Sequence, residues 1–418
     1  MSRSKIRGII ILFLTASFLQ ISGCTIIKMG SLFLSGHLDR KGFTKEVDFQ
    51  YQGDLIFLAV RLNDLPREYR FVFDTGAAFN VLSTRVAEDI GIEAVAKDTI
   101  KDASKRTGEV KFAKIPKITI AGIPFQNTAT AVMDIDTGPR LKCYRIEGVI
   151  GTNLMRLVNT WRIDYRRKKI TFSDHEELVP EHKEILTLGF KRNMQRIPEI
   201  DLKINDHLKI KCEIDLGSAN SFMSDLSTLE KIKKHFPGIH MISGTGEMGG
   251  GALGSLRGTT YVVPLKNAWI GNAHIGPIFM NIKNNAFSSI GNGFFRNYTI
   301  TFNWEKNRLT LLPYSSSRNP LSFPTFGFGI GFDETDKSFY INFLYRRSSA
   351  DDCGLKLGDK LLSIDGKTLG SITEEDYCRY LFEPESLLGK DEKLMISIDR
   401  NGQSLTYHLF KTDLVDLS

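Results

Sequence analysis

Short apolar runs separated by polar turns recur along most of the chain. Residues 54–62 and 68–73 are apolar, partly alternating runs on either side of the turn residues 63–66. This pattern predicts two neighbouring β-strands joined by a turn. Runs of the same kind follow through about the first 315 residues, so we expect a mainly β fold.

Two stretches depart from this pattern and predict short helices. Residues 84–90 end before a glycine, and residues 227–236 end before a Pro-Gly pair, which are residue types that terminate helices. In the second stretch, Ser227 and Glu230 have the spacing of a capping box. We therefore expect Ser227 to cap that helix.

The sequence repeats itself at a spacing of about 140 residues. Residues 70–77 (RFVFDTGA) are echoed by residues 211–218 (KCEIDLGS), which places Asp215 141 positions after Asp74. Three further landmarks recur in the same order: residues 115–122 and 263–271, residues 148–153 and 288–293, and the strand–turn–strand segments 161–172 and 301–312. Such a repeat indicates a duplicated β lobe.

Aspartate stands at the centre of both copies of the repeat. Asp74 follows three large apolar residues and precedes a glycine by two positions, which predicts a carboxylate on a tight turn beside a strand. Two carboxylates within a few ångström share one proton over a wide pH range. One can then activate a water while the other polarises a carbonyl group. Asp74 and Asp215 would form such a pair where the two copies of the repeat bring their turns together.

Residues 71–77 (FVFDTGA), followed about 75 residues later by Val149-Ile150-Gly151, resemble the retropepsin-like aspartic proteases. The likeness is greatest to bacterial lipoprotein members that carry a PDZ domain. It implies two retropepsin-like β lobes, residues 45–180 and 181–315, that form a bilobal protease with Asp74 and Asp215 as catalytic residues. The resemblance also assigns active-site loops of Thr75, Gly76, Ala77, Leu216, Gly217 and Ser218, and supporting segments of Val149, Ile150, Gly151, Ile290 and Gly291.

The second copy of the repeat departs from the pattern of that family. Leu216 stands where the family usually has Thr or Ser, whose hydroxyl links the two active-site loops, and Ser289 replaces an apolar residue. Half of that link is therefore missing, although Thr75 retains its own half. Two functions follow: an aspartic endopeptidase that cleaves proteins or extended peptides, or a catalytically impaired lipoprotein that binds peptides as a scaffold.

Residues 243–254 are rich in glycine and predict a loop. The resemblance implies that this loop is a mobile flap over the substrate cleft, formed by Gly244, Gly246, Gly249, Gly250 and Gly251. An ordinary surface loop is the alternative. A second literal Asp-Thr-Gly, at residues 136–138, is interpreted as a turn because a proline and an arginine follow it where an apolar strand should begin.

The last hundred residues resemble a PDZ domain of the bacterial protease type. The specific feature is the string Gly-Leu-x-x-Gly-Asp-x-Leu-x-x-Ile-Asp-Gly at residues 354–366, which an alternating Gly/Phe run precedes. The resemblance implies an α+β domain over residues 326–413 after a linker at residues 316–325. Gly327, Phe328 and Gly329 would bind the C-terminal carboxylate of a peptide ligand, whose strand adds to the sheet. A domain that binds no peptide is the alternative.

Composition and charge narrow the range of partners. The formal charge is +7 at pH 7, but the first 23 residues hold three basic residues and no acidic one, which leaves +4 over the remaining 395. This small excess is not an electrostatic footprint for nucleic acid. The eight histidines are scattered and the five cysteines lack metal-ligand spacing, so we expect no metal or other cofactor. The internal duplication removes the need for a dimer, and we expect a monomer.

Residues 1–24 have the order of an export signal: a basic start, an apolar run and small residues before Cys24. Residues 21–24 resemble the lipobox of bacterial lipoproteins. This implies a lipid anchor on Cys24 in the bacterial cell envelope, at the outer membrane facing the periplasm; a plain cleaved signal is the alternative. An oxidising compartment would permit disulfides, but the sequence cannot pair Cys143, Cys212, Cys353 and Cys378.

Overall fold

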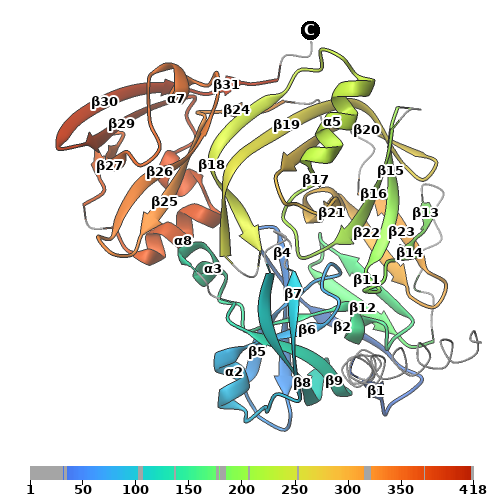
Figure 1. Cartoon of the computed structure of the whole chain (residues 1–418). Helices are drawn as coiled ribbons and strands as arrows, with labels where there is room; N and C mark the ends of the chain where they lie inside the picture. The colour runs from blue at the N-terminus through green and yellow to red at the C-terminus, as the bar shows by residue number, and fades with distance from the viewer. Residues whose placement is uncertain are drawn as a thin grey trace, which may run out of the picture.

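The computed structural model describes residue 32 and residues 35–101, 107–135, 138–175, 178, 185–205, 208–251, 254–314, 322–370 and 372–415. These residues form a mainly β protein, as the sequence predicts (Figure 1). The export signal with Cys24, residues 136–137 of the predicted turn and residues 316–321 of the predicted linker lie outside the described residues. In the part of the chain that is described, no helix is long and apolar enough to cross a membrane.

The first half of the chain forms a closed ring of six strands, called here the first ring. In order around the ring these are β4 (Leu55–Leu62), β5 (Glu68–Phe73), β10 (Gly148–Ile150), β6 (Asn80–Ser83), β9 (Ile123–Met133) and β8 (Thr107–Ile120). β8 pairs back with β4 and so closes the ring. β4 and β5 agree within one residue with the two strands predicted there. Short strands β1 (His37–Leu38) and β3 (Gln50–Gln52) pair with β9 and β4.

The second half of the chain forms a ring with the same strand order, called here the second ring. Its members are β15 (Pro198–Ile204), β16 (Leu208–Asp215), β21 (Ser289–Gly291), β17 (Phe222–Asp225), β20 (Ala273–Lys283) and β19 (Gly254–Ile270). β19 pairs back with β15, as β8 does with β4. The short β14 (Lys191–Arg192) pairs with β15. The repeat in the sequence therefore corresponds to a repeat in strand topology.

A third, six-stranded sheet joins the two rings. β11 (Thr160–Asp164) and β22 (Tyr298–Asn303) pair antiparallel at its centre. Each forms a hairpin with the strand that follows it, β12 (Lys169–Ser173) or β23 (Arg308–Pro313), as the strand–turn–strand segments predict. β2 (Thr44–Asp48) and β13 (Leu186–Gly189) complete the sheet at its edges. One apolar core continues through both rings and this sheet, so the rings are packed as one body.

The helices lie close to where the sequence predicts them, with one correction. α2 (Thr84–Asp89) is capped by Ser83, whose hydroxyl accepts the Val86 N–H. α5 (Leu226–His235) is capped by Asp225, not by Ser227 as predicted. The Asp225 carboxylate accepts the Thr228 N–H at 3.2 Å and also the Ser227 hydroxyl. The carboxylate is the stronger acceptor, which is why the capping box predicted at Ser227 is wrong.

In each ring, one long strand continues beyond the ring and forms a hairpin there. In the first ring this is β7 (Ala96–Lys101) with β8, and in the second it is β18 (Ile242–Gly251) with β19. The glycine-rich residues up to Gly251 are therefore strand, and the loop predicted for them is wrong; residues 252–253 lie outside the described residues. β18 pairs on both sides, with β19 and with β26 (Ser338–Tyr345). At residues 244–246 both neighbours pair with β18, which favours a strand where the glycines alone would not.

The glycines of β18 permit close contact with β26. A Cβ atom at Gly244 would lie 2.3 Å from the Phe343 ring, and one at Gly246 would lie 2.2 Å from the Asn342 carbonyl oxygen. Such separations are far inside van der Waals contact, so no larger residue fits without moving β26. Glycine within a strand often marks a close approach of another backbone, and that reason explains these two positions better than flexibility does.

Residues 324–413 form a C-terminal domain with its own apolar core. Its further elements are β25 (Phe328–Asp333), α7 (Ser349–Asp352), β27 (Lys360–Ile364), β28 (Lys367–Thr368), α8 (Glu374–Phe382), α9 (Glu385–Leu388), β29 (Lys393–Arg400) and β30 (Gln403–Phe410). The sheet of this domain is continuous with that of the second ring through β18 and β26 (Figure 1). β24 (Pro324–Thr325) pairs with β31 (Thr412–Asp413), so the last two residues of the predicted linker belong to this domain.

Candidate active site

Asp74 and Asp215 occupy equivalent places at the ends of β5 and β16. The Asp74 N–H donates to the Ile150 carbonyl oxygen of β10 at 3.0 Å. Each carboxylate accepts the N–H of the glycine two residues further on, at 2.7 Å from Gly76 and at 3.0 Å from Gly217. The two turns are therefore built in the same way, as the repeated Asp-x-Gly predicts.

The two turns face one another across the ring interface. A Cβ atom on Gly76 would lie 2.7 Å from Oδ1 of Asp215, and one on Gly217 would lie 2.3 Å from Cγ of Asp74. Each glycine thus lies directly against the opposite aspartate, where any side chain would push the carboxylates apart. Each aspartate also shifts the pKa of the other, so the structure brings the predicted pair together.

The surroundings of this pair favour the retention of a proton. Burial raises the pKa of Asp74, although the N–H groups of Gly76 and Ala77 favour its ionised form. Burial, followed by the charge of Asp74, raises the pKa of Asp215 well above its ordinary value. Two half-buried carboxylates that face one another cannot both ionise without a large electrostatic cost. They therefore titrate as one unit that holds a proton between its two members.

Thr75 links the two turns. Its hydroxyl donates to the Ile214 carbonyl oxygen at 2.6 Å and accepts the Leu216 N–H at 3.0 Å. The Thr75 side chain is fully buried, so both bonds form in an environment where a lost bond is costly. Leu216 is also fully buried, in the apolar core. The half of the link that the sequence predicts for Thr75 is therefore present. Leu216 has no hydroxyl and cannot make the other half.

Two residues that the sequence patterns do not single out support the second turn, one directly and one through the other. Asn292, the first residue of α6 (Asn292–Phe295), donates from Nδ2 to the Leu216 carbonyl oxygen at 2.6 Å. The Tyr165 hydroxyl, at the end of β11, donates to Oδ1 of Asn292 at 2.6 Å. The only available signal is that Asn292 follows Gly291, at the place where the first copy of the repeat has Thr152.

The predicted supporting segments lie directly behind the turns. β10 and β21, which contain Val149, Ile150, Ile290 and Gly291, pair in parallel with β5 and β16. A Cβ atom on Gly151 would lie 2.3 Å from the Phe79 carbonyl oxygen, and one on Gly291 2.4 Å from that of Asn220. These glycines therefore allow the loop after each aspartate to pack closely. Ser218, in the second turn, donates its N–H to the Asp215 carbonyl oxygen at 3.2 Å.

The walls beside the two aspartates have unlike chemistry. Val72 lies two residues before Asp74, and Glu213 lies two residues before Asp215. Each therefore lies on the same face of its own strand as the aspartate that follows it. Their cross-strand partners are Phe57 and Glu199. In the first ring, Val72 and Phe57 belong to a buried apolar cluster, called here the apolar wall: Leu55, Phe57, Val72 and Tyr144.

In the second ring the same wall is acidic. Within the described part of the chain, Glu213 has no ion pair, and Asn193 donates a hydrogen bond from Nδ2 to its Oε1 at 3.1 Å. Lys211 lies 3.7 Å from Glu199, not from Glu213. Burial, followed by the charges of Glu199 and Asp74, raises the pKa of Glu213 to about 7. Glu213 thus changes its charge near neutral pH, close to the aspartate pair.

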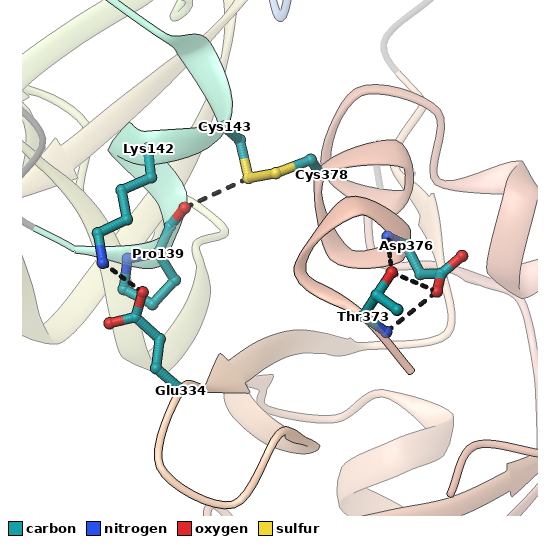
Figure 2. Close-up of a disulfide and its surroundings, with 7 residues drawn as sticks. All are labelled: Pro139, Lys142, Cys143, Glu334, Thr373, Asp376 and Cys378. Atoms are coloured by element: carbon teal, nitrogen blue, oxygen red, sulfur yellow. Dashed lines mark hydrogen bonds and ion pairs between the residues drawn. A yellow bond between two sulfur atoms is a disulfide. The ribbon is translucent and has the colours of Figure 1, made fainter. Parts of the chain in front are cut away.

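The C-terminal domain covers the apolar wall. Leu381 and Phe382 of α8 pack on it, and the rings of Phe382 and Tyr144 lie 5.0 Å apart. α8 is also joined by a disulfide, Cys143–Cys378, to α3 (Pro139–Tyr144) of the first half of the chain (Figure 2). This resolves the pairing that the sequence leaves open: Cys212 is free and buried, and Cys353 is free and exposed.

The C-terminal domain also holds the glycine-rich hairpin. Residues 244–246 of β18 pair with residues 343–345 of β26. Glu247 continues this contact, since its carboxylate accepts the Tyr340 hydroxyl at 3.0 Å and the Asn342 amide at 3.1 Å. The segment that the sequence assigns as a flap, with Gly244, Gly246, Gly249, Gly250 and Gly251, is thus a strand that is anchored outside its own ring.

The loop predicted to bind a peptide carboxylate lies at the start of β25. The N–H of Gly327 donates to Oγ1 of Thr325 at 3.0 Å, and its carbonyl oxygen accepts the Tyr345 N–H at 2.8 Å. Phe328 and Gly329 belong to β25 and pair with β26. Both backbone groups of Gly327 are therefore used within the domain.

Comparison with known protein families agrees with this geometry. Residues 58–154 match the model of the aspartyl protease family. The match includes Asp74, Thr75 and Gly76 together with β10, so this part of the chain is an aspartyl protease domain. It ends before Asp215, whose assignment depends on the repeat and on the geometry. No curated protein matches the chain. Among the described residues, no group of three or more His, Cys, Asp or Glu is placed to hold a metal ion.

Proposed function

We propose that the protein is an aspartic endopeptidase in which the two rings are retropepsin-like lobes and Asp74 and Asp215 are the catalytic residues. One observation carries this proposal: the two aspartates are half-buried in equivalent turns, and each carboxylate lies against the glycine of the opposite turn. The aspartyl protease match over residues 58–154 supports the same activity for the half of the site that it covers. The substrate would be a protein or an extended peptide.

The reaction requires one proton on the aspartate pair. The ionised carboxylate takes a proton from a water, whose oxygen attacks the carbonyl carbon of the peptide bond. The protonated carboxyl group donates a hydrogen bond to the carbonyl oxygen and stabilises the tetrahedral intermediate. A proton is then transferred to the nitrogen, and the C–N bond breaks. Because the pair titrates as a unit, we assign neither Asp74 nor Asp215 a fixed role.

The test uses the chain from Thr25 onward, incubated with denatured proteins and a peptide mixture between pH 3 and pH 8. We expect new amino termini in the unaltered protein and none with Asp74→Asn or Asp215→Asn. Asp98→Asn is the matched control, because Asp98 is an exposed aspartate on β7, in the hairpin that β7 forms with β8. Cleavage that persists in both active-site variants would sink the assignment of the pair.

A second candidate function is peptide binding without hydrolysis. Two observations favour it: Leu216 lacks the linking hydroxyl, and the C-terminal domain packs on the apolar wall beside Asp74. In that case labelled peptides would bind the unaltered protein and the Asp74→Asn variant equally, and neither would produce fragments. Fragments that appear only with the unaltered protein exclude this function.

We further propose that the C-terminal domain is PDZ-like and that the protein is exported and anchored by a lipid on Cys24. The first proposal rests on the residue string at 354–366 and on the α+β content of the domain. The second rests on the sequence of residues 1–24 alone. Metabolic labelling with a radioactive fatty acid tests the anchor, which predicts label in the unaltered protein and none in Cys24→Ser.

A further inference from the structure

We propose that Tyr165 and Asn292 are positioning residues that replace the hydroxyl missing at Leu216. The proposal rests on the function proposed above, because it concerns the geometry of the same aspartate pair. Tyr165 belongs to the first half of the chain and Asn292 to the second. Together they form a chain of two hydrogen bonds, each 2.6 Å long, from the joining sheet to the Leu216 carbonyl oxygen.

The peptide group that Asn292 holds is the one that binds the catalytic carboxylate. The Leu216 carbonyl and the Gly217 N–H belong to one peptide unit, which is planar and rigid. Asn292 fixes the oxygen of this peptide unit. The N–H of the same unit, which belongs to Gly217, donates to Oδ1 of Asp215 at 3.0 Å. When the oxygen is held, the N–H is aimed at the carboxylate. Asn292 therefore controls the orientation of Asp215 without touching it.

The two residues are rigidly placed. The side chain of Asn292 is fully buried and that of Tyr165 is 8% exposed, so neither polar group has water as an easy alternative partner. The rings of Phe49 and Tyr51 pack edge-on against Tyr165, at 6.1 and 5.4 Å. The Tyr165 N–H also donates to the Tyr314 hydroxyl at 2.7 Å. The tyrosine is thus held by packing on its ring and by a bond on its backbone.

The first ring does not use the same arrangement. Thr152 takes the place of Asn292 there, and its hydroxyl bonds the Ala78 carbonyl oxygen of its own ring at 3.4 Å. The long amide of Asn292, which reaches from a tyrosine of one half to a turn of the other, is present only in the copy that carries Leu216. The hydroxyl lost at Leu216 and the amide gained at Asn292 are two changes at the same turn.

The experiment compares Tyr165→Phe and Asn292→Ala with Tyr51→Phe. The control removes a hydroxyl that bonds Asp54 at 3.0 Å, beside Tyr165 but outside the hydrogen-bonded chain. We expect kcat for a fluorogenic peptide to fall about tenfold in each test variant, with KM within about twofold and with little change in the control. Unchanged kcat in both test variants, at a temperature where they are folded, overturns the proposal.

A rescue variant separates positioning from general stability. Leu216→Thr introduces the missing hydroxyl, and we expect it to restore most of the lost kcat in the Asn292→Ala protein. A structural role alone would predict no such recovery, because threonine fills less of the apolar core than leucine does.

A second readout does not depend on hydrolysis. The Gly217 N–H lowers the pKa of Asp215, whereas burial, followed by the charges of Asp74 and Glu213, raises it. Loss of Tyr165 or Asn292 should loosen that N–H and raise the Asp215 pKa further, as measured by carbon NMR of the carboxyl groups. If the unaltered protein cleaves nothing, the proposed function fails while this measurement still tests the positioning. An Asp215 pKa that is the same in Tyr165→Phe and in Tyr51→Phe overturns the inference.

Discussion

The two rings carry the same Asp-x-Gly turn on equivalent strands, yet they hold it by different means. The first turn provides a hydroxyl, Thr75, that reaches across to the second. The second turn provides none and depends on Asn292, which is in turn bonded by Tyr165. Both hydroxyls that support the second turn therefore come from the first half of the chain. Duplication preserved the geometry of the turn, while the supporting contacts became concentrated on one side.

The C-terminal domain is also attached to the two rings by different contacts. It is attached to the first half of the chain by a disulfide and by the apolar packing of α8. It is attached to the second ring by strand pairing between β18 and β26. One attachment is covalent and buries apolar side chains, whereas the other combines backbone pairing with the hydrogen bonds of Glu247. The following predictions test this difference and the difference between the two turns.

The largest expected effect comes from removing the disulfide. Cys143→Ser with Cys378→Ser should cost about 4 kcal/mol of unfolding free energy, because the bridge spans 235 residues and restricts the unfolded chain. Amide exchange should quicken in α3 and α8 but not in β18, as measured by mass spectrometry. Cys353→Ser, at an exposed free cysteine, is the control. Equal loss of protection in β18 would show that the two attachments act as one.

The next effect concerns the hydroxyl of the first turn. Thr75→Val should lower the unfolding free energy by about 3 kcal/mol, since it leaves the Ile214 carbonyl and the Leu216 N–H buried without a partner. Peptide hydrolysis should fall by about a hundredfold or more, because the second turn is released. Thr75→Ser keeps the hydroxyl and should stay near the unaltered protein in both urea unfolding and hydrolysis. A serine variant as impaired as the valine variant would assign the role to the methyl group.

The half-buried carboxyl group of Glu213 in the second ring should lower the free energy of unfolding as pH rises. The pKa of Glu213 is about 7 in the folded protein, against an ordinary value of 4.5. Between these values the folded state binds more protons than the unfolded state, so stability is lost as pH rises from 4.5 to 7. Glu213→Gln removes this loss and should add about 2 kcal/mol at pH 8 but little at pH 4, after allowance for partial exposure.

Urea unfolding at the two pH values measures that difference. Glu230→Gln, at an exposed position of α5, provides the comparison and should show no pH-dependent gain. A gain of equal size at pH 4 and pH 8 would contradict the electrostatic explanation for Glu213.

The smallest expected change in stability comes from Ser289, which lies in β21 behind the second turn. The hydroxyl of Ser289 is buried and has no hydrogen-bond partner among the residues that the structure describes, at a place where the first ring has Val149. Ser289→Ala should therefore stabilise the protein by about 1 kcal/mol. Ser288→Ala should do the reverse, since the Ser288 hydroxyl bonds that of Ser224 at 2.6 Å. Thermal unfolding of the two variants compares the signs, and a loss of stability in both would contradict this account.

The sequence predicts most of what is local in the candidate site. Gly76 and Gly217 recur in the repeat because each lies against the opposite aspartate, where no side chain fits. The same constraint explains Gly151 and Gly291 behind the turns. Where a close approach leaves room only for glycine, the glycine recurs in both copies of the repeat. The repeated Asp-x-Gly therefore predicts that Asp74 and Asp215 lie in equivalent turns.

The remaining features depend on partners that are distant in the sequence. Tyr165 lies 127 residues from Asn292, and although both fall within repeated segments, the repeat gives no sign that they meet. The glycine content of β18 predicts a mobile loop, because composition alone gives no sign that residues 244–246 pair with β26 as well as with β19. The choice of Cys378 as the partner of Cys143 similarly requires knowledge of where α8 packs. Local patterns do not contain this information.

The disulfide has a consequence for any cut in the chain. It closes residues 143–378 into a covalent loop that contains every strand of the second ring. A single break of a peptide bond within this loop leaves two fragments that remain joined through sulfur. No piece of the protein can then be shed by one such cut, and the fragments would separate on a denaturing gel only after reduction.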